Sequence, residues 1–202
     1  RLDDEGRLFI SNIRAGVTRM NELIDDLLAY SRMERRTLES NVLDVAQLIH
    51  QAVTECSASV TPDAIEIIAD VPSIKVQGDR EGLALVIRNL LENAIKFSLH
   101  AIHPRIEFDI YQAGERVVMK IHDNGIGFDM KYSERIFEIF ERLHRLEDYP
   151  GTGIGLALVK KALQRMKGRV WAQSVPGQGA TFYIELPLAQ VTSNDKREQK
   201  IS

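Results

Sequence analysis

The sequence lacks the features that mark several common classes of protein. Its 202 residues include one cysteine, Cys56, so no internal disulfide can form, as is typical of proteins from a reducing cytoplasm. No stretch approaches the roughly 18 to 20 uninterrupted apolar residues of a membrane span, and no signal peptide is visible. We therefore expect a cytoplasmic chain that makes no direct membrane contact.

Charge of a single sign is also missing. The 26 Lys and Arg residues and the 29 Asp and Glu residues give a formal net charge of -3. This balance gives no overall attraction to nucleic acid or anionic lipid, so we expect no nucleic-acid partner. With 44% hydrophobic and 27% charged residues, the composition is that of a soluble domain with a real core.

Two familiar nucleotide motifs are absent, although a glycine loop is present. Gly151, Gly153 and Gly155 alternate immediately before an apolar-periodic run at 156–166. Such a loop directs free N–H groups and the positive end of a helix toward an anion such as phosphate. No Gly-Lys-Ser/Thr follows, and Leu156 occupies the place where a dinucleotide fingerprint needs glycine. The loop therefore predicts a phosphate site of another kind.

A helical run at 83–97 carries an unusual polar face. On a 3.6-residue period, Asn89, Glu92, Asn93 and Lys96 fall within an arc of about 100°. An apolar stripe lies beside them: Val86, Leu90, Ala94 and Phe97. Asparagine is a poor helix former, and two of them inside one helix oppose local propensity. A bound ligand is one explanation, and a solvated polar face is the other.

An alternating run at 117–123 predicts a strand that ends at Asp123. The Asn-Gly pair that follows is also an ordinary turn signal, but it does not explain the acid or the second glycine. A carboxylate only accepts hydrogen bonds, so Asp123 can select an exocyclic amine such as that of adenine and reject a ring carbonyl. Gly125 and Gly127 would let the backbone lie close to a purine.

In order and spacing, the helical segment 89–96, the segment 123–128 and the glycine loop at 151–156 closely resemble the N, G1 and G2 boxes of sensor histidine kinases. That family belongs to a wider ATPase superfamily with DNA gyrase B, Hsp90 and MutL. Two further segments extend the resemblance: the Phe137-Glu-Ile-Phe140 run is similar to the F box, and 176–182 resembles the segment that closes on adenine. The run at 140–155 resembles in particular the output modules of phytochrome-type kinases.

The resemblance implies an α+β fold. Its core is a two-layer α/β sandwich of the Bergerat type, with helices on one face of a mixed, mainly antiparallel sheet, preceded by a long coiled-coil-like helix. The resemblance also implies three parts of the chain. Residues 1–36 are the second half of a dimerisation and histidine-phosphotransfer domain, 37–188 are a catalytic ATP-binding domain, and 189–202 are a tail. The tail is polar and charged, and we expect it to be disordered.

The predicted first helix, at 7–34, carries a heptad pattern. Its apolar residues recur at steps of three and four: Ile10, Ile13, Val17, Met20, Ile24 and Leu27. Such a seam favours a partner helix, with packing on its own domain as the alternative. The segment 25–32 resembles the second dimerisation helix of the kinases, which implies a homodimer through this helix in the full-length protein.

The phosphorylated histidine of that family lies on a preceding helix. The five histidines of this chain are elsewhere: His50, His100, His103, His122 and His144. None falls on the heptad helix, and the chain begins with Arg1 instead of Met. We therefore expect a fragment that lacks the acceptor and does not phosphorylate itself.

The resemblance also assigns roles, with ATP and Mg²⁺ as cofactors. Asp123 selects adenine, supported by Thr181 through water, while Asn93 is a magnesium ligand and Lys96 lies near the phosphates. Glu92 either activates water, as in hydrolysing relatives, or orients the metal or the incoming group. The remaining residues implied to contact the nucleotide are Asn89, Gly125, Gly127, Phe140, Gly151, Gly153, Gly155 and Leu156.

The segment 129–150 resembles the mobile ATP lid of the family. Phenylalanines three residues apart predict a single short helix within it, and a cation on it would face the terminal phosphates. Arg142 is the first candidate for that cation, followed by His144 and Arg145. A solvated charged loop is the alternative.

The resemblance implies a kinase that transfers the γ-phosphate of ATP to a histidine, for relay to an aspartate on a response regulator receiver domain. Two alternatives remain open. One is a degenerate kinase that acts as a dimeric scaffold, and the other is a gyrase- or Hsp90-like ATPase clamp, which would need large domains after residue 190.

Overall fold

A mixed sheet of five strands forms one layer of the structure, a computed structural model that describes residues 4–57, 64–144 and 149–189. The strand order is β2-β4-β5-β7-β6, and β2 pairs with β4 in parallel while the other pairs are antiparallel. The strands are β2 (Glu66–Ile68), β4 (Arg105–Ala113), β5 (Arg116–Asp123), β6 (Arg169–Ser174) and β7 (Ala180–Pro187). A separate antiparallel pair is formed by β1 (Asn41–Asp44) and β3 (Lys75–Gly78).

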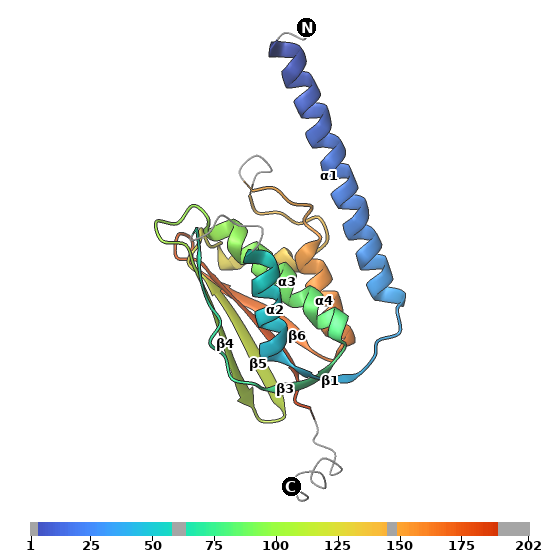
Figure 1. Cartoon of the computed structure of the whole chain (residues 1–202), viewed down its shortest axis with the longest axis vertical. Helices are drawn as coiled ribbons and strands as arrows, with labels where there is room; N and C mark the ends of the chain where they lie inside the picture. The colour runs from blue at the N-terminus through green and yellow to red at the C-terminus, as the bar shows by residue number, and fades with distance from the viewer. Residues whose placement is uncertain (1–3, 58–63, 145–148, 190–202) are drawn as a thin grey trace, which may run out of the picture.

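Helices cover one face of the sheet (Figure 1). They are α2 (Val45–Ser57), α3 (Arg80–Ser98) and α4 (Gly155–Arg165), and a longer helix, α1 (Asp4–Arg35), precedes them. The central helix α3 contacts β4 and β5, while α2 and α4 flank it. The predicted α+β two-layer fold with helices on one face and a long N-terminal helix is confirmed.

The core lies between α3 and the alternate residues of the strands. One apolar flank of α3 is fully buried: Leu83, Val86, Ile87, Leu90 and Leu91 have no exposed surface. It meets strand residues that alternate toward the helices, among them Ile106, Ile121 and Ile184. Because this flank of α3 is held by packing, the neighbouring polar flank has a fixed direction.

A buried carboxylate begins α3 and connects it to the N-terminal helix. Asp79 is 2% exposed, and its side chain accepts a hydrogen bond from the N–H of Gly82 at 2.7 Å as the helix N-cap. The same carboxylate accepts from the Arg36 guanidinium at 2.6 Å and from the N–H of Glu39 at 3.1 Å. Asp79 therefore joins the segment after α1 to the body.

The C-terminal part of α1 lies along α4, whereas its N-terminal part extends beyond the body (Figure 1). Lys161 donates to Glu34 at 2.8 Å, and Arg165 donates to the carbonyls of Met33 and, at 2.7 Å, Arg36. The heptad seam stays on the surface: Ile10, Ile13, Val17, Met20, Ile24 and Leu27 are 40% to 63% exposed. The described part of the chain provides no cover for this seam. No described helix is both long and apolar enough to cross a bilayer.

The expectation of a single short helix in the lid is wrong. Two separate 3-10 turns occur instead, η1 (Met130–Tyr132) and η2 (Arg135–Phe137). The chain becomes extended at Glu138, and Phe140 has a positive φ of 67° because its N–H turns to donate to the carbonyl of Gly153 at 3.0 Å. The glycine loop thus holds the lid backbone out of helical geometry.

The tail falls outside the described residues except at its first position. Ala189 is buried, and its N–H donates to the carbonyl of Lys75 at 3.1 Å. The first residue of the predicted tail therefore belongs to the ordered body.

We expect Asp79→Ala to lower the free energy of unfolding by at least about 2 kcal/mol, because it removes a helix cap worth about 1 kcal/mol and the buried partner of Arg36. Asp44→Ala is the matched control. Asp44 caps α2 by accepting from the N–H of Ala46 at 3.0 Å at a more exposed position, so about 1 kcal/mol should be lost. Urea denaturation measures both, and equal losses would contradict the bridging role of Asp79.

Candidate nucleotide-binding site

A cavity of about 490 Å³ opens between the polar flank of α3, the end of β5, the lid and the glycine loop. That volume suits a small-molecule ligand. Eleven of the predicted site residues line it together: Asn89, Glu92, Asn93, Lys96, Asp123, Gly127, Arg142, Gly151, Gly153, Gly155 and Leu156. Segments far apart in the sequence therefore meet at one place.

Asp123 is the polar group at the apolar end of this cavity. It is 3% exposed, and its Oδ1 accepts from the N–H of Gly125 at 2.9 Å. Burial raises the pKa of the Asp123 carboxyl above its usual range, while hydrogen bonds from the N–H groups of Gly125 and Ala180 oppose the rise. The nearby walls are apolar: Ile126, Phe128, Ala180 and Phe182. One buried acceptor among apolar walls suits an aromatic base that carries an amine.

The two glycines after Asp123 act through close backbone contacts. A Cβ at Gly125 would lie 2.3 Å from the carbonyl oxygen of Phe97, and one at Gly127, where φ is +59°, would lie 2.2 Å from that of Val175. Gly125 itself does not line the cavity. Its role is to let the turn after β5 lie against the end of α3, which holds Asp123 beside the polar flank of that helix.

Cationic groups gather at the other end, around the glycine loop. A Cβ at Gly151 would lie 3.4 Å from Lys96 Nζ, and one at Gly155 would lie 2.6 Å from Asn89 Oδ1, so the loop runs directly over α3. Burial, and then the charge of Arg142, lower the pKa of Lys96 to about 8, although Glu92 opposes this. A bound anion would stabilise the buried positive charge of Lys96 beside Arg142, so this end of the cavity fits phosphates.

The donor set fits a magnesium ion that is held mainly by phosphate oxygens. The described residues contain no cluster of three or more His, Cys, Asp or Glu side chains that could hold a metal. Asn93 lines the cavity and can supply one oxygen, as suits Mg²⁺, which usually keeps several waters. Glu92 lies at the rim, 58% exposed and 4.0 Å from Arg88.

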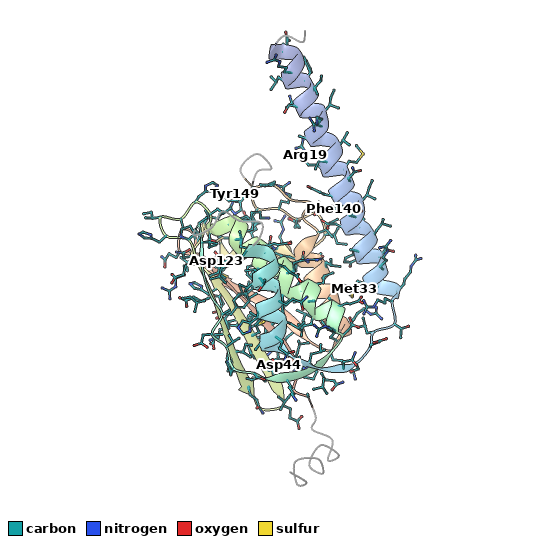
Figure 2. All side chains as sticks on the ribbon, in the orientation of Figure 1. Arg19, Met33, Asp44, Asp123, Phe140 and Tyr149 are labelled. Atoms are coloured by element: carbon teal, nitrogen blue, oxygen red, sulfur yellow. The ribbon has the colours of Figure 1, made fainter. Side chains whose placement is uncertain are left out.

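Besides Gly125, two predicted residues lie outside the cavity. Thr181 points to the opposite face of the sheet, where its hydroxyl lies 2.9 Å from His122 Nδ1, because strand alternation directs its neighbours Ala180 and Phe182 inward. The expectation that Thr181 supports Asp123 does not agree with this geometry. Phe140 is 58% exposed and also lies outside the cavity, toward α1 (Figure 2).

An aromatic cluster that the sequence did not reveal closes the lid onto α3. The Tyr149 ring lies 5.1 Å from Phe97 and 5.4 Å from His144 between centroids, with His100 at 5.9 Å. Arg142 Nη2 donates to the carbonyl of Tyr149 at 2.7 Å, which holds this end of the lid. Of the other lid candidates, His144 lines the cavity, whereas residue 145 lies outside the described residues.

Three carboxylates of α1 also line the cavity: Glu22, Asp25 and Asp26. Asp26 accepts a hydrogen bond from the hydroxyl of Thr152, in the glycine loop. Their spacing of three and four residues places them on one helix face, but the sequence held no sign that this face meets the loop.

The two-layer fold and the cavity define a nucleotide-binding domain, and comparison with known proteins gives its family. Residues 78–190 match the family described as "Histidine kinase-, DNA gyrase B-, and HSP90-like ATPase". The match covers more than half of the chain and all three predicted boxes, so the chain belongs to this family.

Relatives narrow the class further. The chain is 35% identical over 188 residues to phytochrome-like protein Cph1 of Synechocystis sp., covering 93% of this chain and 25% of the relative. It is 33% identical over 197 residues to sensor protein kinase WalK of Staphylococcus aureus, covering 93% and 46%. Full-length ShkA in complex with AMPPNP matches with a TM-score of 0.75 and 27% identity, over 96% of this chain and 41% of that one.

The mycobacterial sensor histidine kinase MprB matches over 76% of this chain and 100% of its own, with a TM-score of 0.67 and 25% identity. The chain therefore contains the ATP-binding catalytic domain of a sensor histidine kinase. It spans about a quarter of the length of its cyanobacterial relatives.

Because the pKa of Lys96 is about 8, nucleotide affinity should depend on pH. Protonated Lys96 attracts phosphate, so raising the pH from 7 to 9 should weaken Mg-ATP binding by up to about tenfold, following the protonated fraction. Lys96→Arg keeps its charge throughout this range and should flatten the profile. Calorimetric titration at each pH measures both proteins, and parallel profiles would show that another group titrates.

Proposed function

We propose that this chain binds Mg-ATP and, in the full-length protein, transfers the γ-phosphate to a histidine on a dimerisation helix, for relay to an aspartate of a response regulator receiver domain. The observation that carries the proposal is the meeting of Asp123, Asn93, Lys96 and the glycine loop in one cavity. The structure of ShkA with AMPPNP supports binding of an adenine nucleotide in this family.

Each lining residue has a role in this proposal. Asp123 accepts a hydrogen bond from the adenine amine, which a guanine carbonyl cannot provide. Lys96, Arg142 and the N–H groups of the glycine loop hold the phosphates, and Asn93 supplies an oxygen to magnesium. Magnesium, when bound, neutralises phosphate charge, so the protein contributes chiefly positioning and charge stabilisation.

Glu92 lies at the rim of the cavity, where it can orient the incoming histidine or the hydration shell of the metal. Its exposure leaves room for an acceptor helix to approach. This position supports the orienting role over general-base activation of a water molecule, which needs a water-excluded site.

The exposed heptad seam supports a homodimer. Residues 1–36 act as the second helix of a dimerisation domain, and 37–188 form the catalytic domain in a cytoplasmic protein. A single helix with this much apolar surface is stabilised by covering it with partner helices. None of the five histidines lies on α1, so the acceptor belongs to another helix of the full-length protein.

We expect Asp123→Asn to weaken ATP binding by about 10- to 100-fold, because the loss of a buried hydrogen-bond acceptor costs about 1–3 kcal/mol. It should also abolish the preference for ATP over GTP. Asp109→Asn makes the same chemical change on the exposed face of the sheet and should leave both affinities unchanged. Calorimetric titration with Mg-ATP and Mg-GTP is the measurement, and absence of ATP binding by the folded wild-type chain would favour the scaffold alternative.

With γ-labelled ATP, we expect the isolated chain to incorporate no acid-labile phosphate, because its histidines lie away from α1. A version extended at the N-terminus to include the preceding helix should become labelled, and Lys96→Met should reduce that labelling. Label on the isolated chain would show that one of its own histidines is an acceptor.

A further inference from the structure

The nucleotide cavity has a wall that the kinase reaction does not explain. Three carboxylates from one face of α1 line it: Glu22, Asp25 and Asp26. The cations of the site, Lys96 and Arg142, come from α3 and the lid. The phosphates of a nucleotide in the cavity would therefore be attracted by Lys96 and Arg142 and repelled by the carboxylates of α1.

Asp26 is held directly at the glycine loop. It accepts a hydrogen bond from the hydroxyl of Thr152, which lies between the two glycines whose backbone flanks the phosphate end. The same hydroxyl receives the N–H of Ile154 at 3.3 Å, at the start of α4. A carboxylate of the dimerisation helix is thereby anchored where the terminal phosphates would approach the loop.

Repulsion between α1 and a nucleotide grows with the number of phosphates. Each added phosphate brings negative charge toward the same loop, and a partly desolvated cavity screens charge less than open water. The adenine end lies at Asp123, away from α1, so the base and the first phosphates are affected least. Repulsion from Asp26 is therefore concentrated on the last phosphate.

The polar contacts that hold α1 against α4 lie largely at the surface. Among the described residues the contacts include the ion pair between Lys161 and Glu34, the hydrogen bond of Arg165 to the carbonyl of Met33, and the buried side chain of Met33. Ala29 and Tyr30 add partly buried packing, and Lys161 Nζ lies 5.9 Å from the centroid of the Tyr30 ring. An exposed ion pair of this kind stabilises little. Repulsion at the cavity can therefore shift the balance between docked and released α1.

We propose that docked α1 discriminates against the γ-phosphate, so that docking through Asp26 and Thr152 competes with the binding of ATP but not of ADP. The inference rests on the proposed nucleotide site. By linkage, docking weakens ATP binding by the same factor that ATP weakens docking. The helix that joins the catalytic body to the dimerisation domain thereby responds to which nucleotide is bound.

Asp26→Asn tests the charge while keeping a polar side chain near Thr152. With magnesium present, calorimetric titration should show about 5- to 20-fold tighter binding of AMPPNP than in the wild-type chain, but less than about twofold tighter binding of ADP. Thr152→Val keeps the carboxylate and removes its anchor, and it should shift AMPPNP affinity in the same direction. Glu5→Gln makes the matched charge change on α1 away from the cavity and should change neither affinity.

A second measurement follows the helix itself. Spin labels at Arg19→Cys on α1 and Gln112→Cys on β4, in a Cys56→Ser background, report the separation of α1 from the body. In the wild-type chain, AMPPNP should broaden the distribution of distances between the two labels, whereas ADP should leave it unchanged. In the Asp26→Asn chain, the distribution should be broad with either nucleotide.

Three results would overturn the proposal. Weaker AMPPNP binding by Asp26→Asn would mean that the α1 carboxylates assist binding, for instance through the metal. Equal gains for ADP and AMPPNP would remove the discrimination. Failure of the wild-type chain to bind even ADP would refute the nucleotide site itself, a result distinct from the other two.

Discussion

The site depends on how α3 is packed. Its apolar flank from Leu83 to Leu91 is buried against the sheet, and the helix cannot rotate without exposing Leu83, Leu90 or their neighbours. The flank next to that stripe therefore points Asn89, Asn93 and Lys96 into the cavity. The buried Asp79 fixes where the helix begins and connects it to the segment after α1. Hydrophobic burial in this way fixes the positions of the polar side chains that line the cavity.

The electrostatics of the cavity are those of a site built around a ligand. Burial raises the pKa of Asp123 and, with the charge of Arg142, lowers that of Lys96, so the ionised forms of both side chains carry a cost in the free domain. An adenine amine and a phosphate chain would relieve both. The carboxylates of α1 that line the same cavity place negative charge beside the glycine loop, at the end that fits phosphates.

Local patterns predicted the elements well, because helical and strand periods are written in neighbouring residues. The helix with the Asn pair, the strand that ends at Asp123, and the glycine loop before α4 all occur within about three residues of the predicted bounds. The lid helix was predicted wrongly, since a contact between Phe140 and the distant Gly153 overrides local spacing. The prediction that Thr181 supports Asp123 does not agree with the structure. Strand alternation turns the Thr181 side chain toward His122 and away from the cavity.

The sequence by itself determined the kinds of chemical group present: a carboxylate at the end of a strand, a glycine loop before a helix, an amide-rich helix and an apolar seam. These follow from residue type and short spacing. Only the tertiary structure decided which of them meet. Tyr149 packs on Phe97, and Asp26 reaches Thr152 across 126 positions, because α1, α3 and α4 pack side by side. Such contacts depend on how separate elements bury their faces together, which no local pattern records.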